Sequence, residues 1–229
     1  MTSGGFAAPV TDLAPLFERA TQNKVILLTT SMGLGRNSIP NRLRDGEVVD
    51  VVLLPEADIQ ALINEGFVLS DTRTALANSS IGVAVRSGAP KPDIGSVEAL
   101  KRTLLQAKSI AYSAQVSGQY LSNELFPRLG IAEQIKNKSQ RVERERVGAV
   151  VARGEAEIGF QQIGELLPIQ GIDFVGPLPA QVQRVTLFSA GVPSKSKNVD
   201  GATAFIRFIA SPDSASSIKK SGLEPVASR

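Results

Sequence analysis

The chain has 229 residues, of which 42% are hydrophobic and 21% are charged, and its formal net charge is +3. This length and composition are typical of a soluble globular protein with room for two lobes. The sequence contains no Cys and no His, which excludes thiol nucleophiles, His general bases, Ser-His-Asp triads and nearly every zinc site.

Nucleic acid is not an expected partner, because the charges are interspersed along the chain and do not form a long basic tract. Two Tyr and no Trp leave little aromatic surface on which bases could stack. No apolar run approaches the ~20 residues of a membrane span. We expect no metal and no cofactor.

Hydrophobic periodicity, helix caps and breakers predict a chain in which helices and strands alternate. The expected helices are residues 5–21, 39–44, 57–64, 97–107, 120–126, 131–135, 147–152, a helix from 163, 202–209 and 214–220. The expected strands are residues 24–29, 48–54, 80–85, 109–112, 141–143, 156–162, 172–175 and 185–190. Alternation of this kind favours an α/β fold with parallel strands.

The first residues, Met1–Phe6, have the pattern of the last part of a strand that leads into a helix. We therefore expect residues upstream of Met1, a signal peptide among them. On this basis the absence of a signal sequence is weak evidence for the cytoplasm.

The central motif is the turn at residues 112–120, between a short apolar strand and a helix. Its small residues leave backbone N–H groups at the start of the helix, where the peptide dipoles favour an anion. Tyr112, Ser113, Ser117 and Gly118 are the candidate ligand residues here. Tyr112 also fits a core position with its hydroxyl bonded to the backbone.

A second loop of small residues follows the strand expected at 24–29. Its candidate ligand residues are Ser31, Met32, Gly33, Gly35 and Arg36. Arg36 brings a planar fork that suits a carboxylate, but like most arginines it also fits a solvated position or an ion pair with Asp45. Gly33 and Gly35 also fit a tight turn without a ligand.

Several stretches resemble the solute-binding proteins of bacterial ABC uptake systems, and among them the molybdate-binding branch. They are residues 3–6 (SGGF), 153–161 (RGEAEIGFQ), 205–212 (FIRFIASP) and 221–225 (SGLEP). The resemblance implies an α/β, type II periplasmic-binding-protein fold, in which each of two lobes is a mainly parallel sheet flanked by helices. Lobe 1 would comprise residues 1–80 and 187–229, and lobe 2 residues 81–186. A ligand cleft would lie between the lobes and close by a hinge motion at the two crossings.

The same resemblance carries the first oxyanion loop to Ser3, Gly4 and Gly5, the second to residues 31–36, and the seat in the second lobe to Ser117, Gly118 and Tyr120. Two departures from the molybdate pattern change the expected ligand. The second loop is larger and contains Arg36, and Gln161 and Gln162 replace a Thr-Asp pair after the family's Tyr. Arginine and side-chain amides make a dicarboxylate or tricarboxylate at least as good a candidate as molybdate.

Arg146 is a further candidate ligand residue, in a run of charges from Arg141 to Arg146. We expect this run to be a solvated edge with one residue that faces inward. An ion pair with Glu143 is the alternative role for Arg146.

Two functions remain open, and a third needs a unit that this sequence lacks. A solute-binding protein would be a periplasmic monomer that delivers its small anion to an ABC permease. An aconitate isomerase-type enzyme on the same fold would move a proton along an unsaturated tricarboxylate. Without His, its base would be a carboxylate, a tyrosine or a lysine whose pKa is shifted by burial and neighbours, and the candidates are Tyr112, Tyr120 and Glu165. A sensing module of a regulator would require a DNA-reading unit that this chain does not contain.

Overall fold

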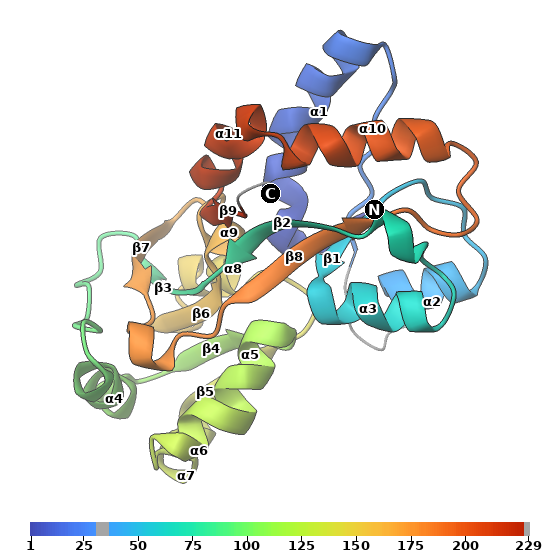
Figure 1. The fold of residues 1–229 in the computed structure, drawn as a ribbon. Helices are drawn as coiled ribbons and strands as arrows, with labels where there is room; N and C mark the ends of the chain where they lie inside the picture. Colours follow the sequence, from blue (N-terminus) through green and yellow to red (C-terminus); the bar gives the residue numbers. More distant parts are fainter. Residues whose placement is uncertain (31–36, 227–229) are drawn as a thin grey trace. The chain divides into compact units, whose positions relative to one another are not determined.

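The computed structural model describes residues 1–30 and 37–226, and the chain divides into two compact units. Unit 1 comprises Met1–Ser79 and Thr186–Arg229, and unit 2 comprises Ser80–Val185. The helices and strands are labelled in Figure 1. The α-helices are α1 (Ala7–Thr21), α2 (Ile39–Arg44), α3 (Glu56–Asn64), α4 (Val97–Gln106), α5 (Val116–Tyr120), α6 (Phe126–Arg128), α7 (Ala132–Ile135), α8 (Val147–Ala152), α9 (Ile163–Leu166), α10 (Val199–Ala210) and α11 (Ala215–Lys220). The strands are β1 (Val52–Pro55), β2 (Thr74–Ser79), β3 (Ile81–Arg86), β4 (Ile110–Ser113), β5 (Ser139–Val142), β6 (Ile158–Gln162), β7 (Ile172–Pro177), β8 (Thr186–Gly191) and β9 (Leu223–Pro225).

Unit 1 is built on a sheet with the strand order β1-β8-β2-β9, covered by helices on both faces. In Figure 1, α10 and α11 run along one side of this sheet and α3 lies on the other. The apolar stripe of α1, which includes Val10, Leu13 and Phe17, is buried in the core. The Phe17 ring meets the ring of Phe205 from α10 edge to face at 5.0 Å between centroids, which fixes how the two helices cross.

The strand predicted at residues 24–29 is wrong, because this segment forms only an isolated bridge from Thr29 to Thr2. The Thr2 N–H donates to the carbonyl of Leu28 at 2.9 Å, and the N–H of Thr30 donates to the carbonyl of Thr2 at 3.2 Å. Among the described residues, the segment pairs only with Thr2, and a single paired residue gives an isolated bridge rather than a ladder of hydrogen bonds between two strands.

The α/β class is confirmed, but the expectation of mainly parallel sheets is wrong for the named strands of unit 1. There, β8 pairs antiparallel with β1 and β2, and β9 pairs antiparallel with β2. The reason is chain direction: β8 brings the chain back into unit 1 and enters between β1 and β2. The prediction also missed β2 and β9.

Unit 2 is built on a five-stranded mixed sheet with the order β5-β4-β6-β3-β7. β4 pairs parallel with β5 and β6, whereas β3 pairs antiparallel with β6 and β7. Successive residues of a strand point to opposite faces. Ile110, Ile158 and Phe160 thus enter the larger core, and Ala111 lies in the smaller core under α8.

The parallel arrangement of β4, β5 and β6 decides where the polar residues of unit 2 gather. Parallel strands end at the same edge of a sheet, and here each is followed by a helix, respectively α5, α8 and α9. Gly159 allows α8 to lie close to β6, because a Cβ there would come within 2.5 Å of Val151 and 2.8 Å of Val147. We call this end of the sheet the carboxyl edge of unit 2.

Gly118 marks the closest approach of α5 to β4. A Cβ at this position would lie 1.5 Å from the carbonyl oxygen of Ser113, a backbone atom that cannot turn away. Glycine is therefore required by packing alone, whether or not the residue meets a ligand.

We predict that Gly118→Ala destabilises the protein by at least about 1–3 kcal/mol, because the clash outweighs the roughly 1 kcal/mol by which Ala favours a helix. Urea unfolding followed by circular dichroism measures the change. Gly95→Ala is the matched control, since a Cβ there meets only Asp93 Oδ1, at 3.4 Å. Equal stability of the two variants would contradict this account.

Candidate functional site at the carboxyl edge of unit 2

The turn between β4 and α5 is fixed by hydrogen bonds at both of its ends. The N–H of Ala114 donates to the carbonyl of Val142 in β5 at 2.9 Å, and the N–H of Gln115 donates to Ser113 Oγ at 3.1 Å. The helical bonds begin with the N–H of Gln119, which donates to the carbonyl of Gln115 at 2.9 Å. The N–H groups at residues 116–118 precede that bond and lie at the positive end of the helix. The turn thus leaves these N–H groups ahead of the first helical bond, and their role as an anion seat stays a prediction.

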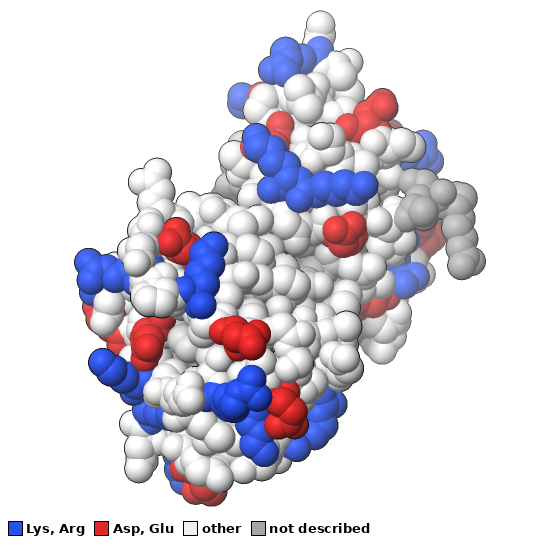
Figure 2. All heavy atoms as spheres, turned by 90° about the vertical axis from the view of Figure 1, so that its left-hand side faces the viewer, with Lys and Arg blue, Asp and Glu red and all other residues white. Residues whose placement is uncertain are grey.

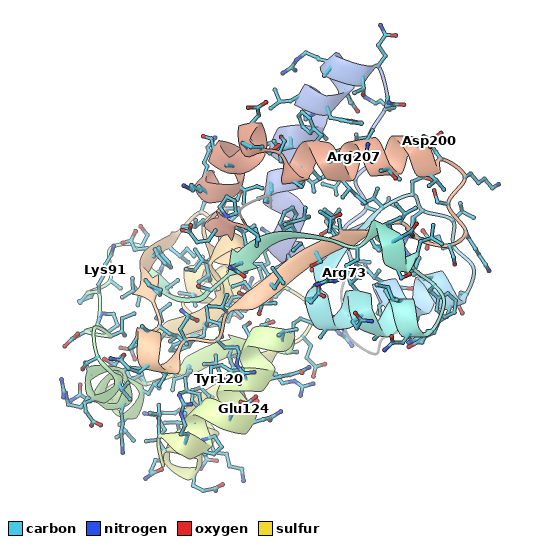
Figure 3. The ribbon with its side chains drawn as sticks, viewed as in Figure 1. Arg73, Lys91, Tyr120, Glu124, Asp200 and Arg207 are labelled. Atoms are coloured by element: carbon cyan, nitrogen blue, oxygen red, sulfur yellow. The ribbon has the colours of Figure 1, made fainter. Side chains whose placement is uncertain are left out.

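The two tyrosines of this turn contribute to the core. The Tyr120 hydroxyl donates to the carbonyl of Val182 at 2.8 Å, and Arg184 lies 4.5 Å above its ring centroid. Arg184 also pairs with Glu124, which lies in the π-helical turn Leu121–Leu125 directly after α5; Tyr120 and Glu124 are labelled in Figure 3. Tyr112 is half-buried and meets Phe126 edge to face at 5.8 Å. A structural role accounts for both rings, and a ligand or catalytic role stays a prediction.

Arg146 differs from the other arginines of its run. Arg141 is exposed and pairs with Glu143 at 3.2 Å, whereas Arg153 holds Glu145 at 2.8 Å and Glu155 at 2.7 Å. Arg146 is half-buried at the N-cap of α8, and within residues 1–30 and 37–226 its guanidinium forms no ion pair. Its charge is therefore left to act on its surroundings, and among the charged residues at 141–146 it alone is not exposed.

Gln161, near the end of β6, connects two of the helices at the carboxyl edge. It is 3% exposed, and its Oε1 accepts a hydrogen bond of 2.8 Å from the N–H of Val147, the first residue of α8. Its side chain also acts on the carboxyl of Glu165 in α9, as a hydrogen-bond partner that lowers the pKa of that group. Gln162, the last residue of β6, is buried at the same edge.

Glu165 is the acid at this edge whose protonation is most strongly changed by the fold. Burial raises the pKa of its carboxyl from 4.5 to about 7, and this effect exceeds the opposing effects of the Arg146 charge and of the hydrogen bond from Gln161. A carboxyl group with this pKa is poised to accept and return a proton near neutral pH. Of the three candidate bases, it is the one whose environment suits proton transfer.

The candidates in unit 1 lie at the start of the chain or outside the described residues. Ser3 is the N-cap of a short 3-10 turn, Gly4–Phe6, that leads directly into α1. A Cβ on Gly5 would come within 2.6 Å of the Phe188 ring, so packing requires glycine there too. Ser31, Met32, Gly33, Gly35 and Arg36 lie outside the described residues.

No sequence pattern pointed to Asp58, an acid of unit 1 whose pKa is raised. Burial raises the pKa of Asp58 in the first turn of α3. The neighbouring Glu56 accepts hydrogen bonds from Arg73 and from Ser189, which is fully buried in β8. Arg73 is labelled in Figure 3. No sequence pattern distinguishes these acids from those of any amphipathic helix, because their environment comes from residues far along the chain.

Charge on the surface is mixed, as the composition indicates. On the face shown in Figure 2, Lys and Arg lie among Asp and Glu and do not form one broad basic field. Among the described residues, no helix combines the length and apolar character that a membrane crossing needs.

The comparisons with known proteins agree with this fold. Residues 1–224 match the model of the family described as bacterial extracellular solute-binding protein. The chain belongs to this family. Family membership implies a small ligand and a partnership with an ABC transporter.

The chain is similar to one protein named as an enzyme and to solved structures of proteins named as oxyanion binders. An aconitate isomerase from Pseudomonas sp. is 45% identical over 227 residues, covering 99% of this chain and 87% of that protein. The periplasmic molybdate-binding protein of Azotobacter vinelandii has a TM-score of 0.78 at 21% identity, covering 100% of this chain and 98% of that one. A tungstate-binding protein from Desulfovibrio alaskensis G20 has a TM-score of 0.67 at 17% identity, covering 100% and 98%. The two solved structures, at 21% and 17% identity, show the shared fold, which is that of the periplasmic binding proteins.

We predict that Glu165 makes the protein less stable as the pH rises. Its pKa is raised in the folded state, so the folded protein binds the proton more tightly between pH 4.5 and about 7. This stabilisation amounts to about 3 kcal/mol. It is fully present below the pKa of Glu165 in the unfolded chain and is lost as the pH rises through the pKa of Glu165 in the folded protein. Urea unfolding of the native protein and of Glu165→Gln, at intervals from pH 4 to pH 8, measures it by difference. If the difference in the free energy of unfolding between the two proteins does not vary with pH, the pKa of Glu165 is not raised in the folded protein.

Proposed function

We propose that the protein is an isomerase that shifts the double bond of an unsaturated tricarboxylate, with aconitate as its substrate. The observation that carries the proposal is Glu165, a partly buried carboxyl whose pKa of about 7 suits proton transfer. The charge of Arg146 acts on it, and within residues 1–30 and 37–226 Arg146 forms no ion pair. The 45% identity to an aconitate isomerase over nearly the whole chain supports the same conclusion. Solute binding without chemistry is the competing function, and the family match favours it.

The proposed reaction is a proton shift along three carbons, with no change in oxidation state. Ionised Glu165 removes a proton from the methylene carbon, which lies beside both a carboxylate and the double bond. The electron pair of the broken C–H bond forms a new double bond, and the old one becomes a carbanion stabilised by its own carboxylate. Protonated Glu165 exchanges its proton with solvent and then gives a proton to the former vinyl carbon. One C–H bond breaks and one forms, so no cofactor is needed.

The other candidates would bind and orient the substrate. Arg146 lies beside Glu165 and would stabilise the negative charge that develops on the substrate as the proton leaves. The N–H groups at residues 116–118 and the Ser117 hydroxyl would donate hydrogen bonds to a carboxylate of the substrate. The loops at Ser3–Gly5 and at residues 31–36 remain proposed ligand contacts on the resemblance alone. We also propose that the protein acts as a monomer in the periplasm.

Proton NMR in deuterated water distinguishes an isomerase from a binder. We expect the protein to convert cis-aconitate into the trans isomer, with deuterium entering the product from solvent. Glu165→Gln should lose at least about a hundredfold in rate, since general-base catalysis contributes roughly 10²–10⁴-fold. That variant should still broaden the lines of the bound ligand. If the native protein broadens the ligand lines but does not convert the ligand, the protein is a solute-binding protein and the proposed isomerase activity is wrong.

Arg146→Ala should weaken the binding of tricarboxylate by more than about tenfold, since one charge-assisted hydrogen bond contributes roughly 1.5–3 kcal/mol. Isothermal titration calorimetry on the Glu165→Gln background avoids turnover during the measurement. Arg144→Ala is the control, because Arg144 is exposed and lies two residues away in the same loop. If both variants bind equally well, Arg146 has no role in binding.

A further inference from the structure

The side-chain amide of Gln161 has a defined orientation because its two ends meet different partners. The Oε1 atom accepts from the N–H of Val147 at 2.8 Å, in a buried hydrogen bond. The Oε1 atom is taken by this bond and an ionised carboxylate can only accept, so the hydrogen bond to ionised Glu165 comes from the amide nitrogen. Turning the amide over would face oxygen with oxygen and N–H with N–H. Only one of its two orientations is therefore compatible with both neighbours.

The bond to Val147 determines more than the start of a helix. Val147 begins α8, and Arg146 is the N-cap residue directly before it. The backbone of Arg146 is therefore held one peptide bond away from the contact with Gln161. Gly159 supports this placement, because its lack of a side chain allows Val147 and Val151 to lie against β6. The same strand thus sets the positions of both the cation and the amide.

A buried glutamine often serves the fold alone, and Gln183 in the same unit is an example. Its Oε1 accepts from the N–H of Ile81 at 2.9 Å, and its Nε2 donates to the carbonyl of Ile81 at 2.9 Å. Both partners are backbone groups, so Gln183 only joins two segments. Gln161 differs because one of its ends meets an ionisable side chain.

We propose that Gln161 is a positioning residue, which links the start of α8, with Arg146, to the carboxylate of Glu165 and holds the cation and the base in a fixed arrangement. This inference rests on the proposed function, in which Glu165 exchanges protons with the substrate. A base must lie within about 3 Å of the proton it removes, and a displacement of about 1 Å can cost roughly a hundredfold in rate. The amide also favours the ionised carboxylate, because it donates to that form.

Two substitutions separate these effects. Gln161→Glu has nearly the same shape and keeps an oxygen for the N–H of Val147, but it puts a second carboxyl against Glu165. Two carboxyl groups that share a site do not readily both ionise, so the proton is held more tightly. Gln161→Leu removes both hydrogen bonds and leaves the first N–H of α8 without its acceptor.

The first measurement needs no catalysis. Carbon-13 NMR follows the side-chain carboxyl of Glu165 with pH, and the signal is assigned by its loss in Glu165→Gln. We expect both Gln161 variants to raise the pH midpoint of this signal by about one unit or more. Gln183→Leu, the matched control, should lower the thermal midpoint of unfolding but leave the Glu165 signal unchanged. An unchanged midpoint in folded Gln161→Glu would overturn the proposal.

The second measurement is the pH profile of aconitate isomerisation. Gln161→Glu should lower kcat by about 10–100-fold and move the ascending limb to higher pH, with a smaller effect on KM. Normal kcat in this variant would also overturn the proposal. If the native protein does not isomerise aconitate, the proposed function fails, and the NMR titration still decides whether Gln161 orients the carboxyl group.

Discussion

Burial of the Glu165 carboxyl is the constraint on which the candidate site depends. The protein contains its own comparison in Glu145 and Glu155, whose pKa values are lowered by direct hydrogen bonds to Arg153 at the surface. Glu165 also has an arginine nearby, but burial has the larger effect and raises its pKa. The difference lies in contact and solvent, because Arg153 binds its partners directly whereas Arg146 acts on Glu165 through its charge. An acid in a tight surface pair would remain ionised and return no proton at neutral pH.

Backbone packing brings these groups together. The parallel strands β4, β5 and β6 end at one edge, so the turn at Ser113, the loop before Arg146 and the end of β6 become neighbours. Close contact depends on glycine at three points. Gly118 brings α5 onto the end of β4, Gly159 brings α8 onto β6, and a Cβ on Gly148 would already lie 3.0 Å from Ile169, just beyond α9. Within unit 2, the packing of small residues therefore determines the spacing of the polar ones.

Much of the fold could be predicted from sequence because its signals are local. Apolar periodicity and caps give α2 and α8 with their observed ends, and Ser96 caps α4 by accepting the N–H of Ala99 at 3.1 Å. Strand direction could not be predicted in this way. β8 is antiparallel to both of its neighbours because of the path by which the chain returns, and no pattern inside residues 186–191 records that path.

The sequence names residues that gather at the carboxyl edge of unit 2, but it does not rank the roles proposed for them. Sequence reasoning named Tyr120 and Glu165 together as possible bases and had no means of ranking them. Their difference comes from distant partners: the Tyr120 hydroxyl is taken by Val182, 62 residues away, whereas Glu165 is affected by Arg146 and Gln161. The bond between Gln161 and Val147 joins positions 14 residues apart, and it forms only because Gly159 allows α8 to approach. A pattern of residue types does not contain this geometry.

A carboxyl group beside the proposed anion site would be difficult to explain by binding alone. An ionised Glu165 would repel a tricarboxylate, and a bound anion would in turn raise the pKa of Glu165 further. Glutamine at position 165 would donate hydrogen bonds to the same ligand without this conflict, as the neutral donors of oxyanion-binding proteins do. Proton transfer explains a carboxyl group at this position, because Glu165 must then be ionised for part of each catalytic cycle and neutral for the rest. Arg146 offsets the charge of the bound substrate and so lets the ionised form persist beside it. The pairing of a buried acid with a nearby cation that it does not directly bind is thus the arrangement that isomerisation requires and simple capture does not.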